Sequence, residues 1–383
     1  MQAMSKTWWA TAMAATAVVA GGLGLQACSK GGEKSEGTAA VSAVASVTAS
    51  ASGSAAPKEA SLEELIKASK ALSPQPKEQK AGAATIHADL CKLEGAPFLG
   101  KSSSTLLRSV AVVGNKLVVA DEKGALHGYS IDKTGGCKLT VDQGFGTDGV
   151  LKLPRDINYL SSDDTGRILA SNGIFSAYAV KDGKQEFECK TSGNLEPTAT
   201  GKWAIGPWVN ATVKLVDVGP SGCTGQEWVL KDLGNDAKRQ GAFKNVNTSA
   251  VIGDLILIAG VPVEKVNGRE PRIVVAYDKA GKEKFRFGNT ATTTGPDTFG
   301  WIHALSACRA GICALDSNYK RISLWKSGGG FVASVELGPL FDMKSPWIQD
   351  FAVAKDGTAY FVTAQAREGS PVVEGNIYAV RGL

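Results

Sequence analysis

The chain has 383 residues, of which 42 are Lys or Arg and 37 are Asp or Glu, and its formal net charge is +5 at pH 7. So small a positive excess over so long a chain is not the charge pattern of a protein that binds nucleic acid. Only three histidines are present, which disfavours a copper or iron site.

Residues 1–27 have the pattern of a secretory signal peptide. Lys6 is the only charged residue ahead of Cys28, and it precedes an apolar run from Trp8 to Leu25. A basic start, an apolar middle and small residues at the cleavage site are typical of such a signal. A transmembrane anchor would need about 20 apolar residues. This run is shorter, rich in Gly and Ala, and ends at a cysteine, so we expect cleavage and export.

The residues Leu25-Gln26-Ala27-Cys28 resemble the lipobox of bacterial lipoproteins, in which Leu and two small residues precede Cys. Gln26 departs from that pattern because it is bulkier and more polar. The resemblance implies a thioether-linked diacylglycerol on Cys28 and a further acyl chain, such as palmitate, on its amino group. Several chains together anchor a protein stably. Ser29 stands where Asp would favour inner-membrane retention, so we expect the outer membrane of a two-membrane bacterium.

Residues 28–85 have the composition of a flexible tether. Ala, Ser, Gly, Lys, Thr and Pro dominate and aromatic residues are almost absent, so the segment cannot bury enough apolar surface to offset its ordering entropy. Ser61-Leu62-Glu63-Glu64 is a capping box that precedes Leu65, Ile66 and Leu72 on one helical face. A short helix near 61–72 is therefore predicted, either as a marginal helix of the tether or as a docking helix for a partner.

Residues 86–383 contain a repeat of apolar strands and turns. The clearest strand recurs six times, after turn residues, at 116–121, 166–171, 201–206, 253–258, 311–316 and 357–362. The repeats start at intervals of roughly 44 to 54 residues, and such a period with three or four strands per unit is typical of propeller blades. Helical repeats would show an apolar period of 3.6. We therefore predict an all-β, six-bladed β-propeller of four-stranded blades.

The closure of this ring is expected at the N-terminal side of the domain. A fourth strand follows in five repeats, at 138–142, 185–189, 227–231, 283–287 and 331–335, whereas the sixth repeat ends after its third strand. Cys91-Lys-Leu-Glu94 with Phe98-Leu-Gly100 is similar to Cys137-Lys-Leu-Thr140 with Gly144-Phe-Gly146. We predict that the strand at 91–100 completes the last blade and leaves no free sheet edge.

The rhythm of glycine, apolar strand, Ala-Asp, turn and Arg-Ile resembles the NHL repeats of six-bladed propellers. It is clearest in Val118-Val-Ala-Asp121 and from Leu315-Asp316 to Arg321-Ile322, and Gly201-Lys-Trp203 departs from it. NHL propellers bind proteins, nucleic acids or small ligands, and a few related ones are enzymes. The resemblance therefore implies an architecture more than an activity.

Six cysteines follow Cys28, and an even number in an exported chain predicts disulfides. None forms a Cys-x-x-Cys pair, which disfavours zinc binding and thioredoxin-like chemistry. One pair flanks the turn of a single hairpin, a second occupies equivalent fourth strands on either side of the closure, and a third lies toward the outer edges of the next two blades. The predicted structural pairs are Cys308–Cys313, Cys91–Cys137 and Cys189–Cys223.

The loops that enter the first strands of a propeller lie on one face, and here they are rich in polar and aromatic residues. Rigid rings beside hydrogen-bonding groups suit a recognition surface. The predicted binding face consists of Arg155, Asp156, Asn247, Trp301, His303, Trp347, Gln349 and Asp350. His303 opens a blade beside the expected central channel, although a lone histidine more often packs than catalyses. Phe145, Phe243 and Phe299 are expected to pack between blades.

No catalytic signature is present: the chain lacks a Gly-x-Ser-x-Gly elbow, a P-loop, a His-Glu-x-x-His motif and an EF-hand loop. We therefore predict a non-enzymatic binding or assembly module of the cell envelope, held on a membrane through Cys28, with a protein or saccharide partner and without a cofactor.

The alternative is a calcium-dependent esterase or lactonase. Asp156, Asn247 and Asp350, with Glu196 as a further candidate, could hold Ca²⁺ on the axis because Ca²⁺ takes hard oxygen ligands. These residue types resemble those of gluconolactonase-type propellers, in which the metal polarises an ester carbonyl.

Overall fold

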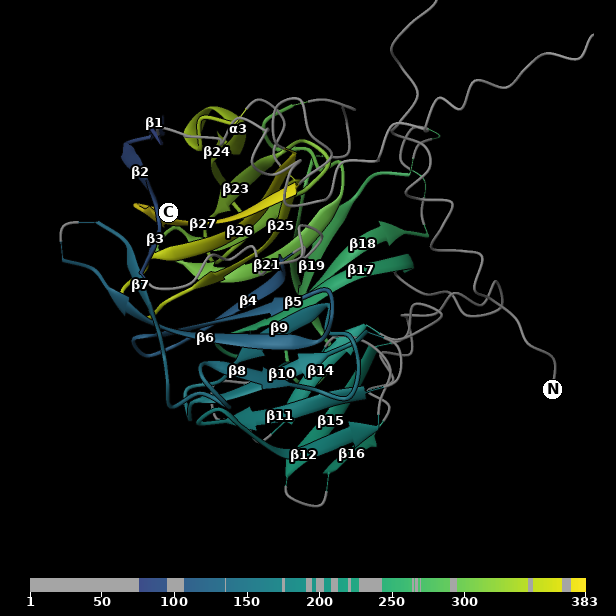
Figure 1. Cartoon of the computed structure of the whole chain (residues 1–383). Coiled ribbons are helices and arrows are strands. Elements are labelled where there is room, and N and C mark those ends of the chain that lie inside the picture. The colour runs from purple at the N-terminus through teal and green to yellow at the C-terminus, as the bar shows by residue number, and fades with distance from the viewer. Residues whose placement is uncertain are drawn as a thin grey trace, which may run out of the picture. The chain divides into compact units, whose positions relative to one another are not determined.

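The structure is a computed structural model, and its described residues all lie within the unit from Glu59 to Leu383. They are residues 76–94, 107–134, 136–173, 176–190, 195–197, 203–207, 213–219, 222–226, 243–263, 265, 268, 270–289, 295–343, 347–366 and 373–383. Cys28 and the helix predicted near 61–72 lie outside them. Strands dominate these residues (Figure 1), and α3 (Leu337–Leu340) is a single helical turn. Within the described residues, no helix combines the length and apolar character needed to cross a membrane.

Four sheets each contain four consecutive antiparallel strands, as the repeat predicted. Their strands are β9 (Tyr159–Ser162), β10 (Arg167–Ser171), β11 (Ser176–Lys181) and β12 (Lys184–Lys190); β13 (Glu196–Pro197), β14 (Trp203–Pro207), β15 (Val213–Gly219) and β16 (Gly222–Gln226); β17 (Phe243–Ile252), β18 (Leu255–Pro262), β19 (Ile273–Tyr277) and β20 (Glu283–Phe287); and β21 (Ile302–Cys308), β22 (Gly311–Asp316), β23 (Arg321–Trp325) and β24 (Phe331–Glu336). The fourth strand of the sheet that begins with β13 is β16 rather than the segment predicted at 227–231, which lies outside the described residues.

Two further sheets are larger, because the N-terminal strands join them, so the prediction of four strands in every blade is wrong there. One has the order β1-β2-β27-β26-β25, and the other has the order β3-β7-β6-β5-β4 with β8 on β6. Their strands are β1 (Glu78–Ala81), β2 (Ala84–Leu90), β25 (Trp347–Val353), β26 (Ala359–Ala366) and β27 (Val373–Arg381); and β3 (Lys92–Glu94), β4 (Leu107–Val113), β5 (Lys116–Asp121), β6 (Ala125–Asp132), β7 (Lys138–Val141) and β8 (Val150–Lys152).

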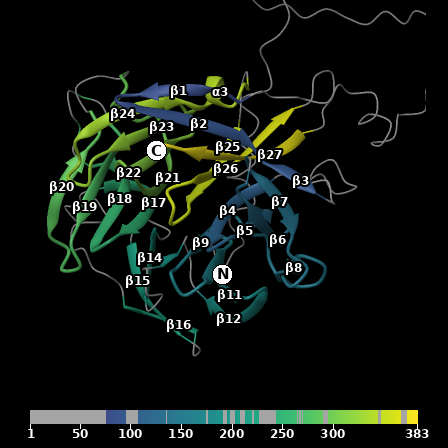
Figure 2. The same ribbon diagram turned by 90° about the vertical axis from the view of Figure 1, so that its left-hand side faces the viewer.

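An N-terminal strand does complete the last sheet, but it is β2 rather than the strand predicted at 91–100. β2 pairs antiparallel with β27, and β3 then pairs parallel with β7, with Leu93 opposite Leu139. Both views place β2 beside β27 (Figures 1 and 2). The two similar segments that suggested the closing strand therefore form β3 and β7, which are neighbours in one sheet. The first strand, β1, also lies ahead of the domain start expected at 86.

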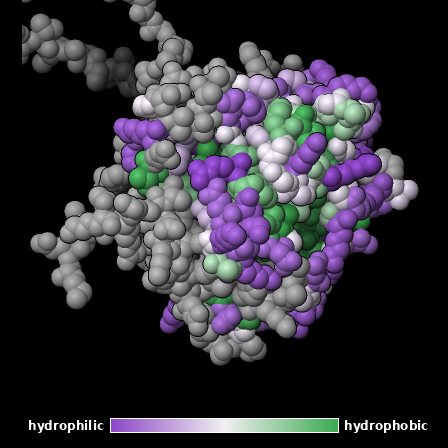
Figure 3. Space-filling view, turned by 180° about the vertical axis from the view of Figure 1, so that it is seen from behind, coloured by the Kyte–Doolittle hydropathy of each residue, from purple (hydrophilic) through white to green (hydrophobic). Residues whose placement is uncertain are grey.

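The first strands of the sheets follow one another in a closed order. β4 contacts β9, β9 contacts β13, β13 contacts β17, β17 contacts β21, β21 contacts β25, and β25 returns to β4. This succession of antiparallel sheets about a common axis is a β-propeller. Figure 3 shows one face, on which apolar residues gather in the middle and hydrophilic residues surround them.

The core lies between the faces of neighbouring sheets. Strands such as β19 and β23 are buried along their whole length, which explains why the sequence shows short continuous apolar runs between turns. Aromatic rings fill the space between the sheets: Phe341 stacks on Tyr378 with ring centroids 4.2 Å apart. Phe145, Phe243 and Phe299 are buried among these clusters, as expected.

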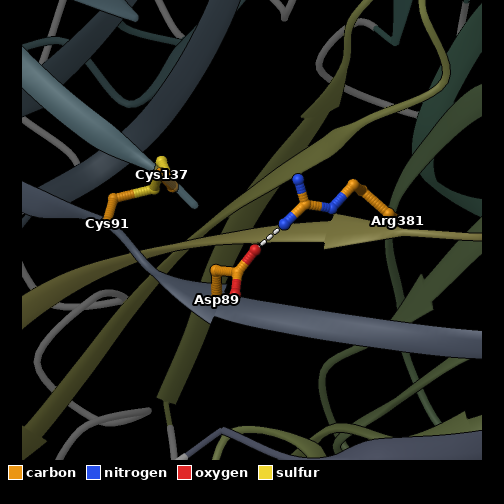
Figure 4. Close-up of a disulfide and its surroundings, with 4 residues drawn as sticks. All are labelled: Asp89, Cys91, Cys137 and Arg381. Atoms are coloured by element: carbon orange, nitrogen blue, oxygen red, sulfur yellow. Dashed lines mark hydrogen bonds and ion pairs between the residues drawn. A yellow bond between two sulfur atoms is a disulfide. The ribbon is translucent and has the colours of Figure 1, made fainter. Parts of the chain in front are cut away.

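All three predicted disulfides are present. Cys189–Cys223 joins β12 to β16 of the next sheet, and Cys308–Cys313 closes the β21–β22 hairpin. Cys91–Cys137 ties the residue between β2 and β3 to the start of β7 (Figure 4). Beside it, the Arg381 guanidinium on β27 pairs with the Asp89 carboxylate on β2. Both contacts hold the N-terminal strands at the closure.

Candidate functional site: a tryptophan cleft and an axial cavity

A cleft of about 450 Å³ opens where β21 and β25 begin. Its lining consists of Arg272, Gly300, Trp301, His303, Ser317, Asn318, Lys320, Trp347, Ile348 and Gln349. Four of the eight residues predicted for the binding face are therefore brought together here: Trp301, His303, Trp347 and Gln349. We call this lining the tryptophan cleft.

The two tryptophans of the tryptophan cleft are unusually open. Trp301 is 39% exposed and Trp347 is 50% exposed, and Val263 and Val332 are the other large exposed apolar side chains of the described residues. The guanidinium carbon of Arg272 lies 5.2 Å from the centroid of the Trp301 ring, within range for a cation–π contact. This contact fixes the ring, so the cleft presents a large apolar surface that is already ordered.

Asp316, at the end of β22, organises the wall of the tryptophan cleft. Its fully buried carboxylate accepts backbone N–H groups of Gly300 (2.6 Å) and Trp301 (3.1 Å) on one side. On the other side it accepts those of Asn318 and Tyr319, both at 3.0 Å. One carboxylate thus links the segment that precedes β21 to the turn that follows β22. In the sequence Asp316 stands out only as part of the repeat; the signal for its role is an acidic residue followed at once by a polar turn.

The same wall leaves no room for a side chain at position 300. A Cβ atom on Gly300 would lie 2.9 Å from the Cβ of Asn318, so glycine allows the two segments to approach. Beneath them, the guanidinium of Arg321 donates to the Thr298 carbonyl oxygen at 2.6 Å. The cleft is therefore built on buried polar contacts rather than on a loose loop.

The charges around the tryptophan cleft are of one sign. Arg272 and Lys320 line it, and no Asp or Glu is among the described lining residues. Burial lowers the pKa of Lys320, although the Asp316 carboxylate opposes that effect. Burial also lowers the pKa of His303, although a hydrogen bond from its ring to the backbone of Gln349 raises that pKa in part. His303 is therefore neutral at pH 7, and the cleft favours electron-rich or anionic groups.

An axial cavity of about 150 Å³ lies next to the tryptophan cleft, and His303 lines both. Its walls come from the first strand of each sheet: β4, β9, β13, β17, β21 and β25. Two carboxyl groups lie on it, Glu196 of β13 and Asp350 of β25. Asp350 and Glu196, which the sequence suggested together only as calcium ligands, thus line one cavity.

Both carboxyl groups hold their protons tightly. Burial, and then the neighbouring Asp350 carboxylate, raise the pKa of Glu196 to about 8. Burial raises the pKa of Asp350 to about 7, even though Asp350 is hydrogen-bonded to the Ser109 hydroxyl and the Phe351 N–H. Near neutral pH the pair therefore changes its protonation state, which is the behaviour expected of buried carboxyl groups that face each other.

The remaining predicted face residues lie elsewhere. Arg155 and Asp156 are exposed in the segment before β9 and line neither the tryptophan cleft nor the axial cavity. Asn247 of β17 lines neither as well, and both polar atoms of its amide are buried without a partner in the described chain. The calcium set Asp156, Asn247 and Asp350 is thus not brought together on one cavity. Within the described ranges, no three His, Cys, Asp or Glu side chains are placed to share a metal ion.

Comparisons with known proteins give little beyond this geometry. No model of a known protein family matches the sequence, and no curated protein sequence matches it. Among solved structures, the chain is similar to the WD40 beta propeller domain of Doa1, with a TM-score of 0.42 and 11% sequence identity. That similarity covers 79% of this chain and 97% of the other.

Proposed function

We propose that this chain is an exported, lipid-anchored protein whose propeller binds a partner protein of the cell envelope through the tryptophan cleft. The observation that carries the proposal is the pair of exposed tryptophans, Trp301 and Trp347, on one cleft whose wall is fixed by the buried Asp316 carboxylate. Exposed large apolar groups in a preformed cleft mark interaction sites rather than ordinary surface.

The chemistry of the cleft suits a polypeptide partner. Trp and Arg are the residues that most often dominate the binding energy of protein interfaces, especially in well-packed pockets surrounded by polar groups. Arg272, Ser317 and Asn318 provide hydrogen-bonding groups beside the two rings. Because Arg272 already lies over the Trp301 ring, a partner would not have to order these two side chains on binding. A saccharide partner remains an outcome of the test below.

Export and anchoring are supported by the chain outside the propeller and by its cysteines. The signal-like residues 1–27 end at Cys28 in a lipobox-like sequence, and Ser29 follows. Six cysteines of the propeller form three disulfides, which form and persist in oxidising compartments such as the periplasm. We place the anchored protein at the outer membrane of a two-membrane bacterium on the basis of Ser29.

We also propose that the six sheets are six blades of one closed ring. The support is that their first strands touch in a cycle and that β2 and β3 link the last sheet to the first. A closed ring leaves no sheet edge free at the closure. It also places the entering loops of neighbouring sheets on one face, where the tryptophan cleft lies.

The proposal is tested by trapping the partner and then measuring the contact. A photoreactive residue at Ser317, on the cleft, is compared with one at Val332, which is exposed on β24 away from it. A protein crosslinked only from position 317 is purified, and its dissociation constant is measured by titration calorimetry. We expect Trp301→Ala and Trp347→Ala each to weaken binding roughly tenfold or more and Val332→Ala to leave it unchanged.

Two results would contradict the proposal. One is equal crosslinking from both positions, which would indicate contact without a site. The other is a partner whose affinity is indifferent to both tryptophans. If instead the trapped material is a saccharide and both variants lose it, the cleft is the binding site but the partner class is wrong.

A further inference from the structure

We propose that the axial cavity binds a primary ammonium group on a short aliphatic stem, with the ammonium held between the carboxylates of Glu196 and Asp350. This site is separate from the tryptophan cleft and does not depend on the partner proposed for it. The proposal follows from three features of the cavity: two carboxyl groups with no cation beside them, polar groups without a hydrogen-bond partner, and an apolar remainder of matching size.

The first feature is the charge of the lining. Glu196, Asp350, His303 and Tyr159 are the ionisable residues on the described walls, and no Lys or Arg is among them. The ring of His303 is hydrogen-bonded to the backbone of Gln349, and it is neutral at pH 7 because burial lowers its pKa. The two carboxyl groups therefore face each other without a cation to balance them. Burial raises the pKa of both groups, and the Asp350 carboxylate raises that of Glu196 further. A cation between them would favour their charged forms.

The second feature is a pair of polar groups on the cavity, on Ser249 and Glu196, that lack a hydrogen-bond partner in the described chain. The hydroxyl of Ser249, a residue only 7% exposed, lines the cavity and has no hydrogen-bond partner in the described chain. No hydrogen bond joins the Glu196 carboxyl group to another described residue. Buried polar groups are normally hydrogen-bonded. A primary ammonium offers three donors and one positive charge, which matches two carboxylates and one hydroxyl.

Asp350 is already held in the orientation that this requires. The Ser109 hydroxyl donates to the Oδ2 of Asp350, and the Phe351 N–H donates to its Oδ1 at 2.8 Å. Ser109 is fixed in turn because its Oγ accepts the Leu160 N–H at 2.8 Å. Strands of three different sheets thus fix one carboxylate at the cavity, so a ligand meets a preorganised acceptor.

The third feature is the remainder of the wall and its volume. Leu160, Leu195, Leu305 and Val353 place alkyl groups on the cavity, which suits a methylene stem. The volume of about 150 Å³ is comparable to that of an engineered protein cavity that takes up benzene. A molecule of about six non-hydrogen atoms fits, whereas a sugar chain or a folded peptide does not.

An ammonium fits these walls better than a divalent metal ion does. Ca²⁺ takes six to eight oxygen ligands, and the described residues place no three ionisable ligands together. The axial cavity adjoins a cleft at each end: His303 also lines the tryptophan cleft, and Ser306 and Val353 also line a cleft of about 750 Å³ on the other side.

The test uses the full chain, with n-butylamine as the probe and n-butanol as its neutral counterpart. Thermal unfolding is followed at pH 7.5 over a range of probe concentrations, because a ligand that binds only the folded state raises Tm by mass action. We expect n-butylamine to raise Tm in a saturable way and n-butanol to raise it much less. Ethylamine and n-hexylamine should be weaker, being too short or too long for the cavity.

Variants then assign the effect to the cavity. Glu196→Gln and Asp350→Asn should each abolish the amine-dependent rise in Tm, and Ser249→Ala should weaken amine binding several-fold. The matched control is Glu283→Gln, whose carboxylate pairs with Arg286 on the exposed side of β20, and it should respond as the unsubstituted protein does. Two-dimensional NMR of the methyl groups of Leu160 and Leu305 gives a second readout that does not depend on Tm.

Each other result would overturn the proposal. Equal stabilisation by the amine and the alcohol would indicate an apolar cavity without charge recognition. Stabilisation by CaCl₂ that both carboxyl variants lose, together with no response to the amine, would indicate a metal site. An amine response that survives in both carboxyl variants would place the amine elsewhere, and no Tm or methyl shift with any amine would leave the cavity without this ligand.

Discussion

Single residues account for the electrostatics at the centre of the molecule. Glu196 and Asp350 lie far apart in the chain, and burial raises their pKa values to about 8 and about 7. Their unfolded-state pKa values lie near 4, so between about pH 4 and pH 8 the folded chain holds more protons than the unfolded chain. Stability from these groups is therefore fully present below that window and is lost as pH rises through it.

Replacing Glu196 should make this pH dependence smaller. Glu196→Gln keeps the shape and cannot ionise, so we expect its free energy of unfolding at pH 8.5 to exceed that of the parent by at least about 1 kcal/mol. The difference should shrink toward pH 5. Urea denaturation at a series of pH values measures it, with Glu283→Gln as the control. If the free energies of unfolding of Glu196→Gln and of the parent changed with pH in parallel, the pKa of Glu196 would not be raised in the folded protein.

A second prediction at this scale concerns Cys28. Its thiol is the proposed attachment point of the lipid, so Cys28→Ser should leave an unlipidated, uncleaved precursor. We expect metabolic labelling with a fatty acid to mark the parent chain and not the variant, and the variant to run at a higher mass. Equal labelling of both chains would end the lipoprotein interpretation.

At the level of elements, the sequence predicted the long central strands well. The bounds of β5 and β22 agree with the predicted runs, because each is an apolar stretch bounded by turn residues. It missed β1 and β13, which are four and two residues long, and it assigned the strand containing β3 to the wrong sheet. Such short segments carry no period of their own and are set by the neighbouring strand.

The candidate site likewise contains residues that the sequence predicted together and residues whose role it could not predict. Trp301, His303, Trp347 and Gln349 were predicted together because the segments entering first strands share a face, a rule of the fold. Glu196 and Asp350 were expected near the axis only within a calcium set that also held Asp156 and Asn247. The sequence could not show that those two residues lie off the cavity, since which inner residues face the axis depends on strand stagger. Asp316 could not be assigned to the tryptophan cleft, because its partners at Gly300 and Trp301 become neighbours only when β21 and β22 pair.

The closing strands give a prediction at this scale. Deleting residues 29–75 removes nothing that pairs in the described sheets, so the product should fold and melt cooperatively. Deleting residues 29–90 also removes β1 and β2, which exposes the edge of β27 and uncovers core around the fully buried Ile86. We expect that product to aggregate or to melt at a clearly lower temperature. Size-exclusion chromatography and thermal unfolding distinguish the two, and a monomeric, equally stable longer deletion would contradict the closure.

At the scale of the whole molecule, one short stretch of chain joins the last sheet to the first. β2 lies in one sheet and β3 in the other, and Cys91 between them is bonded to Cys137. The Asp89–Arg381 ion pair stands beside this link. Because the axial cavity takes a wall from every sheet, the position of Glu196 relative to Asp350 depends on the ring staying closed. The closure thus supports the proposed ligand site as well as the fold.

The disulfide at the closure should therefore matter more than the disulfide of the hairpin. Cys91 and Cys137 are 46 residues apart, whereas Cys308 and Cys313 are 5 apart. The loop-entropy account gives about 4 kcal/mol for the first and about 2 kcal/mol for the second. We expect Cys91→Ala/Cys137→Ala to lower the free energy of unfolding by about twice as much as Cys308→Ala/Cys313→Ala.

The closure variant should differ in a second way, because the hairpin disulfide lies within one sheet and the closure disulfide lies between two. Loss of the closure disulfide should let β3 separate from β7, which reduces the cooperativity of unfolding and weakens n-butylamine binding in the axial cavity. Urea unfolding monitored by tryptophan fluorescence and by far-ultraviolet circular dichroism measures both, since the two transitions should no longer coincide. A hairpin variant that loses as much stability as the closure variant, with coincident transitions in both, would show that the ring does not depend on this link.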